Sequence, residues 1–307
     1  MKIAIIGAGG IGGYFGGLLA AGGQDVHFIV RSRTLEALST RGLTIESPST
    51  PLHLPTVQAS DNPASVGPVE AVIFAVKLPD AHEAAGLLPA LIGPNTVVIP
   101  FQNGVESAQI LSQTLAPEKV ASGVAYIPSA IREPGVIVHG GAFARLRFGA
   151  RDPSQLALLQ SFANACRASG VDGEVVADIK RESWEKFVFL VGLSAMTSVT
   201  RKPIGVIRAD PQMRETLKEV MTETHAVGQA EGAGLPKDFV DNRMAFVDTL
   251  PEMMQASMLH DLQAGKPLEL PWLSGAVVRL AQRHAIATPV NRTIVAALKP
   301  YVGGAPA

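Results

Sequence analysis

The sequence predicts an α/β domain followed by an all-helical domain, and three features support this prediction. The chain has 307 residues, a length typical of about two domains. Its first 30 residues read as a strand, a glycine-rich turn, a helix and a second strand. Beyond about residue 175, short apolar runs bounded by turns give way to long helical patterns. We therefore expect the α/β domain in residues 1–170 and the helical domain in residues 171–307.

Individual elements follow from the apolar runs. Residues 2–6 and 26–30 are expected strands that flank a helix at 13–21, which together form a βαβ unit. The expected sheet then continues with strands at 69–76 and 96–100, separated by a helix at 80–91, and is extended by strands at 120–126, 136–139 and 144–148. Expected helices in the second half cover residues 181–199, 211–231, 236–248, 268–284 and 290–298.

The composition excludes several classes of protein. Charged residues make up 17% and hydrophobic residues 47%, which is typical of a globular chain. Lys and Arg total 26 against 27 for Asp and Glu, so no basic bias points to nucleic acid. The single cysteine, Cys166, reads as a packed thiol in a reducing compartment, and the histidine spacing does not suggest a metal site. The uncharged run at 3–24 has too short an apolar stretch for the core of a signal peptide. The uncharged run at 187–200 is too short to span a membrane. We expect a cytoplasmic protein.

The glycine-rich turn carries the first functional signal. Gly7-x-Gly9-x-x-Gly12 follows the first strand and opens the helix, as the dinucleotide fingerprint requires. The first glycine permits the tight turn, the second lets the backbone approach a pyrophosphate, and the third lets helix and strand pack closely. The alternative is a merely structural turn. The pattern favours a Rossmann-type, doubly wound sheet with dinucleotide bound by Gly7, Ala8, Gly9, Gly10, Ile11 and Gly12.

The end of the second strand indicates which dinucleotide binds. Enzymes that use NAD usually place an acid there for the ribose 2′-hydroxyl, and enzymes that use NADP place a cation for the 2′-phosphate. This chain has Arg31-Ser32-Arg33 there and lacks an acid until Glu36. Because a guanidinium can bind a phosphate bidentately, we expect NADP(H) with Arg31 as its ligand. The alternative is a solvated loop with ordinary surface arginines.

Two further polar residues follow expected strands. Lys77 comes directly after the run that ends at Val76, and Asn103 follows the strand at 96–100. Ligands bind beyond the carboxyl ends of the strands in an open parallel sheet, so both residues are expected to face the cofactor. Asn103 precedes Gly104, and Asn-Gly is also a common turn pair. The default ligand site is the cleft between the two domains.

Motifs spread along the chain resemble those of the ketopantoate reductase (2-dehydropantoate 2-reductase) family. The glycine motif is shared with many dehydrogenases, whereas the combination with Trp-x-Lys and Ser-Met…Asp…Glu is much more selective. The resemblance extends from Gly7 to about Pro289. It rests on Gly7 to Gly12, Val76-Lys77, Gln102-Asn103-Gly104-Val105-Glu106, Pro134-Gly135-Val136, His139-Gly140, Trp184-Glu185-Lys186-Phe187, Ser257-Met258 with Asp261, and Glu269 upstream of Ser274-Gly275.

The resemblance implies NADPH-dependent reduction of 2-dehydropantoate to pantoate, a step of pantothenate (vitamin B5) biosynthesis. It implies that Lys186 is the general acid, which fits the chemistry because hydride addition leaves negative charge on the carbonyl oxygen. It also implies an active-site glutamate at Glu269, near cofactor or substrate, and a substrate-binding serine at Ser257. The alternatives are a snorkelling lysine for Lys186, a helix-start acid for Glu269, and a helix cap or packed hydroxyl for Ser257.

The sequence departs from the family where asparagines are expected around the substrate. Leu190 and Ser194 lie one and two turns after Lys186 on one helix face, and Ile204 stands in the loop beyond. An asparagine that binds a buried substrate group cannot become leucine without losing that bond, worth roughly 1–3 kcal/mol. Two other readings therefore remain open, a reductase of a more apolar 2-oxo acid and a non-catalytic dinucleotide sensor. A homodimer fits the helical half, and the sequence does not decide it.

Overall fold

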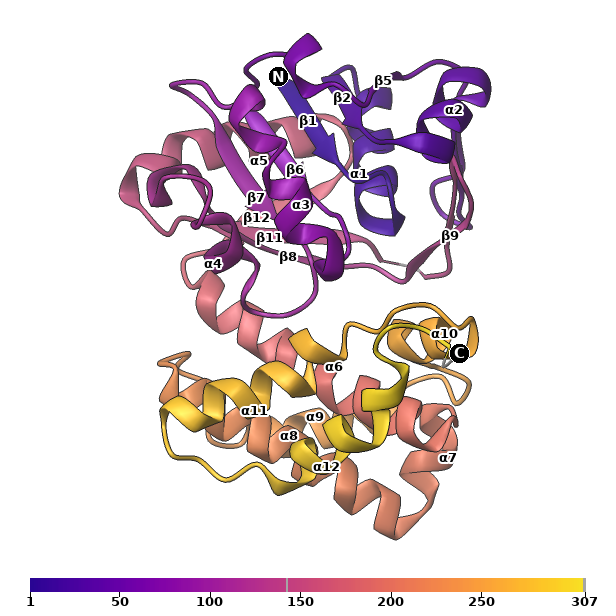
Figure 1. Cartoon of the computed structure of the whole chain (residues 1–307), viewed down its shortest axis with the longest axis vertical. Coiled ribbons are helices and arrows are strands. Elements are labelled where there is room, and N and C mark those ends of the chain that lie inside the picture. The colour runs from indigo at the N-terminus through magenta and orange to yellow at the C-terminus, as the bar shows by residue number, and fades with distance from the viewer. Residues whose placement is uncertain (142, 306–307) are drawn as a thin grey trace. The chain divides into compact units, whose positions relative to one another are not determined.

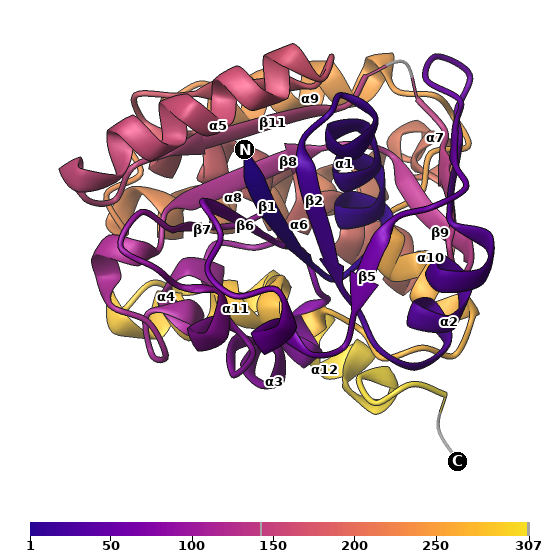
Figure 2. The same cartoon turned by 90° about the horizontal axis from the view of Figure 1, so that it is seen from above.

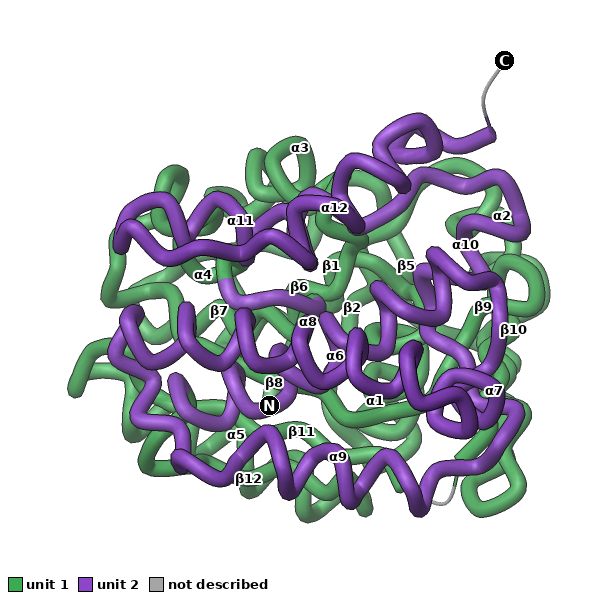
Figure 3. The backbone as a smooth tube through the Cα atoms, turned by 90° about the horizontal axis from the view of Figure 1, so that it is seen from below, with its two compact units in different colours: residues 1–102, 106–179 green, residues 103–105, 180–307 purple. Residues whose placement is uncertain are grey.

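The computed structural model describes residues 1–141 and 143–305. The chain divides into two compact units (Figure 3). Unit 1 comprises residues 1–102 and 106–179, and unit 2 comprises residues 103–105 and 180–307. The division falls between 179 and 180 instead of the expected 170 and 171. The reason is a strand, β12 (Asp172–Val175), which pairs with β11 (Arg145–Gly149) and so belongs to unit 1.

The core of unit 1 is a parallel sheet in the order β5-β2-β1-β6-β7 (Figure 2). Its central strands are buried because they consist of continuous apolar runs such as Ala71–Phe74. This confirms the expected α/β class, and the predicted strand at 2–6 has the observed bounds. The strands are β1 (Lys2–Ile6), β2 (Asp25–Ile29), β5 (Gln58–Ser60), β6 (Ala71–Phe74) and β7 (Val97–Pro100).

The three later strands do not extend this sheet, so that expectation is wrong. Val120 pairs with Val98 through an isolated parallel bridge, but the strand that follows it turns away to pair with β11. Within the described residues, the orders of the other sheets are β4-β3-β10-β9 and β12-β11-β8. Their strands are β3 (Leu43–Glu46), β4 (Leu52–Leu54), β8 (Ser122–Tyr126), β9 (Ser129–Glu133) and β10 (Val136–His139), with β11 and β12 as above.

Helix α1 (Gly10–Ala21) packs against two sheets at once because it carries glycines on two different faces. A Cβ at Gly16 would come within 2.9 Å of both Ile5 and Phe28 in the parallel sheet. One at Gly17 would come within 3.0 Å of Leu43 and Ile45 in β3. The helix begins three residues before the predicted start, since Gly10 to Gly12 are themselves helical.

The remaining helices of unit 1 are mostly short. The single helix predicted for 80–91 is wrong. It is broken into the 3-10 turn η2 (Leu78–Asp80), α3 (Ala81–Ala85) and η3 (Leu88–Leu91), because Gly86 and Pro89 interrupt it. Three α-helices of unit 1 were not predicted: α2 (Ser32–Arg41), α4 (Ser107–Leu111) and α5 (Leu156–Ala168).

Unit 2 is helical in the part that the structure describes, as expected. Its long helices are α6 (Ile179–Thr200) and α8 (Pro211–Ala230) (Figure 1). The two helices contact each other where glycines meet large side chains. Gly192 of α6 faces Met221, and Gly228 of α8 faces Trp184. The helix predicted for 268–284 begins only at Ser274, because residues 268 and 269 are not helical and the turn η6 (Leu270–Trp272) comes before it. The other helices are α7 (Ile204–Ala209), α9 (Phe239–Thr249), α10 (Ser257–Gln263), α11 (Ser274–Arg283) and α12 (Pro289–Leu298), of which α7 and α10 were not predicted.

Across the described residues, the helices are all too short or too polar to cross a bilayer. The same part of the chain holds no group of three or more His, Cys, Asp or Glu side chains that could bind a metal ion.

Candidate active site

The glycine turn lies between β1 and α1 and fits a pyrophosphate. Gly7 has a φ of 92°, which side chains other than hydrogen rarely allow. A Cβ at Gly12 would lie 2.0 Å from the Gly7 carbonyl oxygen, whereas one at Gly9 would meet a single side-chain carbon at 3.7 Å. Among the described residues, no side chain caps α1 at Gly9. The first amide groups of α1 are therefore available to an anion, and the space over Gly9 is open.

Arg31 follows β2 and is the N-cap residue of α2. Its guanidinium Nη1 donates a hydrogen bond to Oε1 of Glu83, on α3. Ser32, the next residue, has a φ of 52°, an uncommon conformation for a residue with a side chain. Lys77 is exposed just after β6, where its carbonyl oxygen accepts a hydrogen bond from the Asp80 amide at 3.0 Å. Because β2, β1 and β6 are parallel neighbours, Arg31, the glycine turn and Lys77 share one edge of the sheet.

Lys186 lies on α6, between aromatic residues that anchor that helix. Trp184 and Phe187 are buried in the core of unit 2, with their rings edge to face at 5.3 Å. They fix the rotation of α6, since they point into the core while Lys186 keeps part of its surface. The packing of these two aromatic side chains therefore sets the position of Lys186 on α6.

Asn103 reaches Lys186 from a distant segment. The Lys186 ammonium Nζ donates a hydrogen bond to Oδ1 of Asn103 at 3.0 Å. The loop of residues 103–105 follows β7, yet it belongs to unit 2, because Val105 packs against the helical core. Gly104, with a φ of 94°, makes the turn between these two contacts. Asn103 is thus a ligand of the lysine as well as a turn residue.

Glu269 completes what we call the lysine cluster, which consists of Lys186, Asn103 and Glu269. Glu269 is 8% exposed, and its neighbours Leu268 and Leu270 are buried. Burial lowers the pKa of Lys186 from 10.5 to about 8, while the negative charge of Glu269 acts in the opposite direction and raises it. At pH 7 the ammonium form still predominates. The cluster therefore holds a proton that can leave near neutral pH.

The other expected substrate residues differ in accessibility. Ser257 is exposed at the start of α10. Leu190 is partly exposed on the same face of α6 as Lys186 and packs against the core of unit 2. Ser194 is 1% exposed, and its hydroxyl has no hydrogen-bond partner among the described residues. Ile204 is fully buried, so of the three departures from the family pattern Leu190 has the most surface for a substrate.

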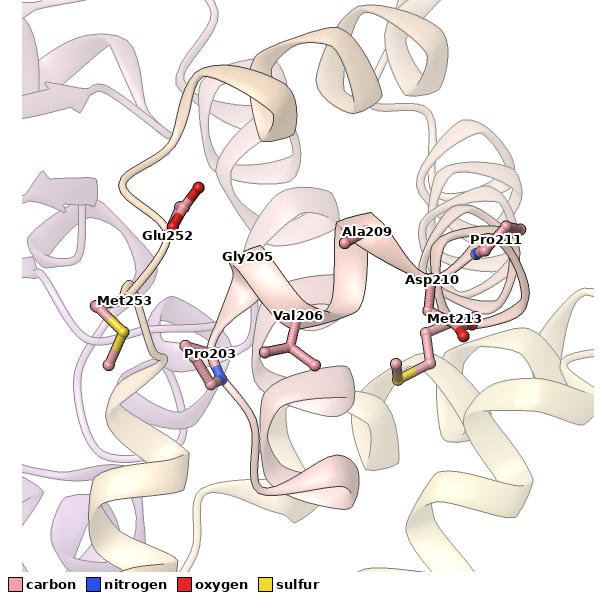
Figure 4. A pocket seen from close by; sticks show the side chains of 9 residues that line it. All are labelled: Pro203, Gly205, Val206, Ala209, Asp210, Pro211, Met213, Glu252 and Met253. Atoms are coloured by element: carbon pink, nitrogen blue, oxygen red, sulfur yellow. Dashed lines mark hydrogen bonds between the residues drawn. The ribbon is translucent and has the colours of Figure 1, made fainter.

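A pocket of about 650 Å³ lies elsewhere in unit 2 (Figure 4). Its acidic residues are Asp210, which caps α8 by accepting hydrogen bonds from the Gln212 and Met213 amides, and the exposed Glu252. None of the predicted site residues lines it. The lining consists of Pro203, Gly205, Val206, Ala209, Asp210, Pro211, Met213, Glu252 and Met253.

Sequence reasoning missed two features of the site. It did not single out Glu83, since a span of 52 residues separates it from Arg31 and local spacing gives no sign of the pair. It also did not anticipate that Asn103 would bind Lys186, 83 residues further along the chain.

Two family models of known proteins match this chain, one in its N-terminal half and one in its C-terminal half. The family model described as Ketopantoate reductase PanE/ApbA matches residues 3–153, and the one described as Ketopantoate reductase PanE/ApbA C terminal matches residues 178–302. The chain belongs to the ketopantoate reductase family. Like its relatives, it is an oxidoreductase that acts on a CH–OH group.

Individual relatives cover nearly the whole chain at moderate identity. The uncharacterized oxidoreductase YkpB of Bacillus subtilis is 30% identical over 303 residues, 98% of this chain and 99% of its own. The 2-dehydropantoate 2-reductase of Halobacterium salinarum is 30% identical over 299 residues, 96% of each chain. The crystal structure of 2-dehydropantoate 2-reductase from Geobacter metallireducens is 30% identical, with a TM-score of 0.91 over 97% of this chain and 99% of that one. A D-mandelate dehydrogenase at 18% identity and a TM-score of 0.89 shares the fold.

Proposed function

We propose that this member of the ketopantoate reductase family reduces 2-dehydropantoate to pantoate with NADPH, a step of pantothenate biosynthesis. The observation that supports this proposal most strongly is the lysine cluster, in which Asn103 holds an ammonium whose pKa is lowered to about 8. A general acid works best when its pKa is close to the working pH. A sensor that merely bound a dinucleotide would gain nothing from such a group.

The proposed reaction needs a hydride for the carbonyl carbon and a proton for the carbonyl oxygen. When bound, a reduced nicotinamide supplies hydride to the carbonyl carbon. The Lys186 ammonium donates a hydrogen bond to the carbonyl oxygen and gives up its proton as negative charge develops there, which leaves a 2-hydroxy acid. Asn103 orients the ammonium, and Glu269 keeps it charged before reaction. Lys186 recovers its proton from solvent after the product leaves.

We assign the binding roles as follows. The amides of the glycine turn and the Arg31 guanidinium bind the pyrophosphate and the 2′-phosphate, respectively, because the turn is uncapped within the described chain and Arg31 follows β2. Lys77 adds positive charge at the same edge. Asn103 and Glu269 contact the nicotinamide end, and Asn103, Lys186, Ser257, Leu190 and Ser194 form the substrate-binding set.

A second candidate substrate is a 2-oxo acid with a more apolar side chain. Leu190 favours it, because an accessible leucine one turn from Lys186 can pack on an alkyl group and cannot hydrogen-bond a hydroxyl. The test compares steady-state kcat/KM with NADPH for 2-dehydropantoate and for 2-oxoisovalerate. We expect 2-dehydropantoate to exceed 2-oxoisovalerate, and an equal or lower value would reject the first candidate for the second.

Two further expectations accompany this proposal. The single buried Cys166 fits a reducing compartment such as the cytoplasm. The proposed homodimer is tested by the mass of the purified protein in light scattering, where a monomer mass across the micromolar range would reject it.

A further inference from the structure

The structure brings an acid to the arginine that was expected to select the cofactor. Scanned from the end of β2, the sequence offers no acid before Glu36, which is why it predicts NADP(H). In the fold, Glu83 of α3 supplies an acid near the end of β2, where it is the hydrogen-bond partner of Arg31. We infer that Glu83 is a specificity-determining residue, which binds the ribose 2′-hydroxyl of NADH and competes with the 2′-phosphate of NADPH for Arg31. This inference rests on the proposed function and makes the site accept both cofactors.

The sheet topology explains how two remote residues meet. β1 pairs with β2 on one side and with β6 on the other, all in parallel. The carboxyl ends of β2 and β6 therefore lie at the same edge, on either side of the glycine turn. Arg31 comes directly from the end of β2, and Glu83 comes from the end of β6 by way of η2 and α3. Their pair lies where the adenosine ribose of a dinucleotide binds in this fold.

The Glu83 carboxylate has opposite effects on the binding of the two cofactors. A carboxylate accepts a hydrogen bond from a ribose hydroxyl, as the acid after β2 does in NAD-dependent enzymes. The same carboxylate repels a 2′-phosphate, which carries between one and two negative charges near pH 7. The phosphate must also take over the Arg31 guanidinium, which Glu83 holds when the site is free. Glu83 thus strengthens NADH binding and weakens NADPH binding.

Exposure allows the exchange of partners. The Arg31 and Glu83 side chains are 63% and 70% exposed, so water screens their attraction and Arg31 can leave Glu83. Lys77, exposed after β6, adds a positive charge at the same edge that a phosphate can use. The site should therefore bind the two cofactors with similar affinity, and we expect the dissociation constants of NADH and NADPH to lie within about tenfold of each other.

The experiment measures cofactor binding in the full-length protein without a 2-oxo acid. Fluorescence of the reduced nicotinamide gives dissociation constants for NADPH and NADH, and competition with 2′,5′-ADP isolates the adenosine end. Glu83→Gln should tighten NADPH and 2′,5′-ADP by about three- to tenfold and weaken NADH by about threefold, so that the ratio of the NADH and NADPH dissociation constants moves by about ten- to thirtyfold. Glu36→Gln removes an equal charge from α2, where the described structure shows no ion pair with Arg31, and should leave the ratio within twofold.

Arg31→Gln completes the comparison. It should weaken NADPH by about tenfold or more and change NADH by less than threefold, because Glu83 remains available to the ribose. A ratio that Glu83→Gln leaves unchanged, or moves no further than Glu36→Gln does, would overturn the inference while leaving the proposed function intact. Failure of the wild-type protein to bind either dinucleotide would overturn the proposed function and this inference together.

Discussion

The glycine turn of unit 1 offers an anion the backbone amides between Gly9 and Gly12, whereas the lysine cluster of unit 2 consists of side chains. The amides come from one stretch of chain and are oriented by the helix they begin. Lys186, Asn103 and Glu269 come from α6, the loop after β7 and the start of η6. The first site is thus encoded locally, and the second exists only after the helical core has formed.

This difference shows what each site tolerates. The glycine turn is constrained by space, since a Cβ at Gly12 would lie 2.0 Å from a carbonyl oxygen. The lysine cluster is constrained by charge, because burial opposes the ammonium and Glu269 supports it. Substitutions that add volume should therefore damage unit 1, and substitutions that change charge should damage unit 2.

The largest effect should come from removing the proposed proton donor, Lys186. Lys186→Ala should lower kcat by about 10²- to 10⁴-fold, the usual contribution of a general acid, and leave the dissociation constant of NADPH within threefold. The matched control is Lys180→Ala, an exposed lysine on the same helix, which should keep full activity. Turnover of Lys186→Ala at the rate of the wild type would refute the assignment.

The next largest effect separates cofactor binding from folding in the glycine turn. Gly9→Ala should weaken NADPH binding by about tenfold or more, because the methyl group fills the open space over the turn. Its thermal midpoint should stay near that of the wild type, since the nearest atom is 3.7 Å away and the φ of −80° suits alanine.

Gly12→Ala is the contrasting variant. It should destabilise unit 1 by about 1–3 kcal/mol through overpacking, as well as lose cofactor binding. Calorimetry of both variants checks this, and equal losses of stability would contradict the distinction.

The same contrast explains how far sequence reasoning reached. The strand, turn and helix of the dinucleotide fingerprint could be predicted because Gly7, Gly9 and Gly12 act through spacing alone. The lysine cluster could be anticipated by family resemblance, which named Lys186 and Glu269, but their geometry could not. The hydrogen bond from Lys186 to Asn103 depends on how Val105 packs, and the pairing of Glu83 with Arg31 depends on strand order. Later strands were misassigned to the main sheet because an apolar run in the sequence does not indicate which strand it will pair with.

A smaller effect concerns the substrate. Leu190→Asn should raise kcat/KM for 2-dehydropantoate relative to 2-oxoisovalerate by about three- to tenfold, because an amide can bond the hydroxyl that leucine cannot. Leu190→Met keeps an apolar side chain of similar volume and should leave the ratio within twofold. An unchanged ratio in Leu190→Asn would show that residue 190 does not contact the substrate side chain.

The smallest effect is on stability, and its pH dependence has a definite sign. Because burial lowers the pKa of Lys186, the ammonium opposes folding below about pH 8, and this cost disappears as the pH rises towards 10.5. Wild-type unit 2 should therefore gain stability relative to Lys186→Met as the pH rises from 8 to 10.5. Both tryptophans, Trp184 and Trp272, lie in unit 2, so their fluorescence during urea unfolding reports on it. Lys180→Met should show no such pH dependence.

The pH profile of single-turnover reduction, measured with enzyme in excess over NADPH and saturating 2-oxo acid, tests directly whether Lys186 gives up the proton. The rate should be highest at neutral pH and fall above a kinetic pKa of about 8, where the ammonium is lost. In Glu269→Gln that limb should move to lower pH, because the negative charge that supports the ammonium is gone. A rate that stays constant from pH 6 to 10, or a limb that Glu269→Gln leaves in place, would contradict the role given to the lysine cluster.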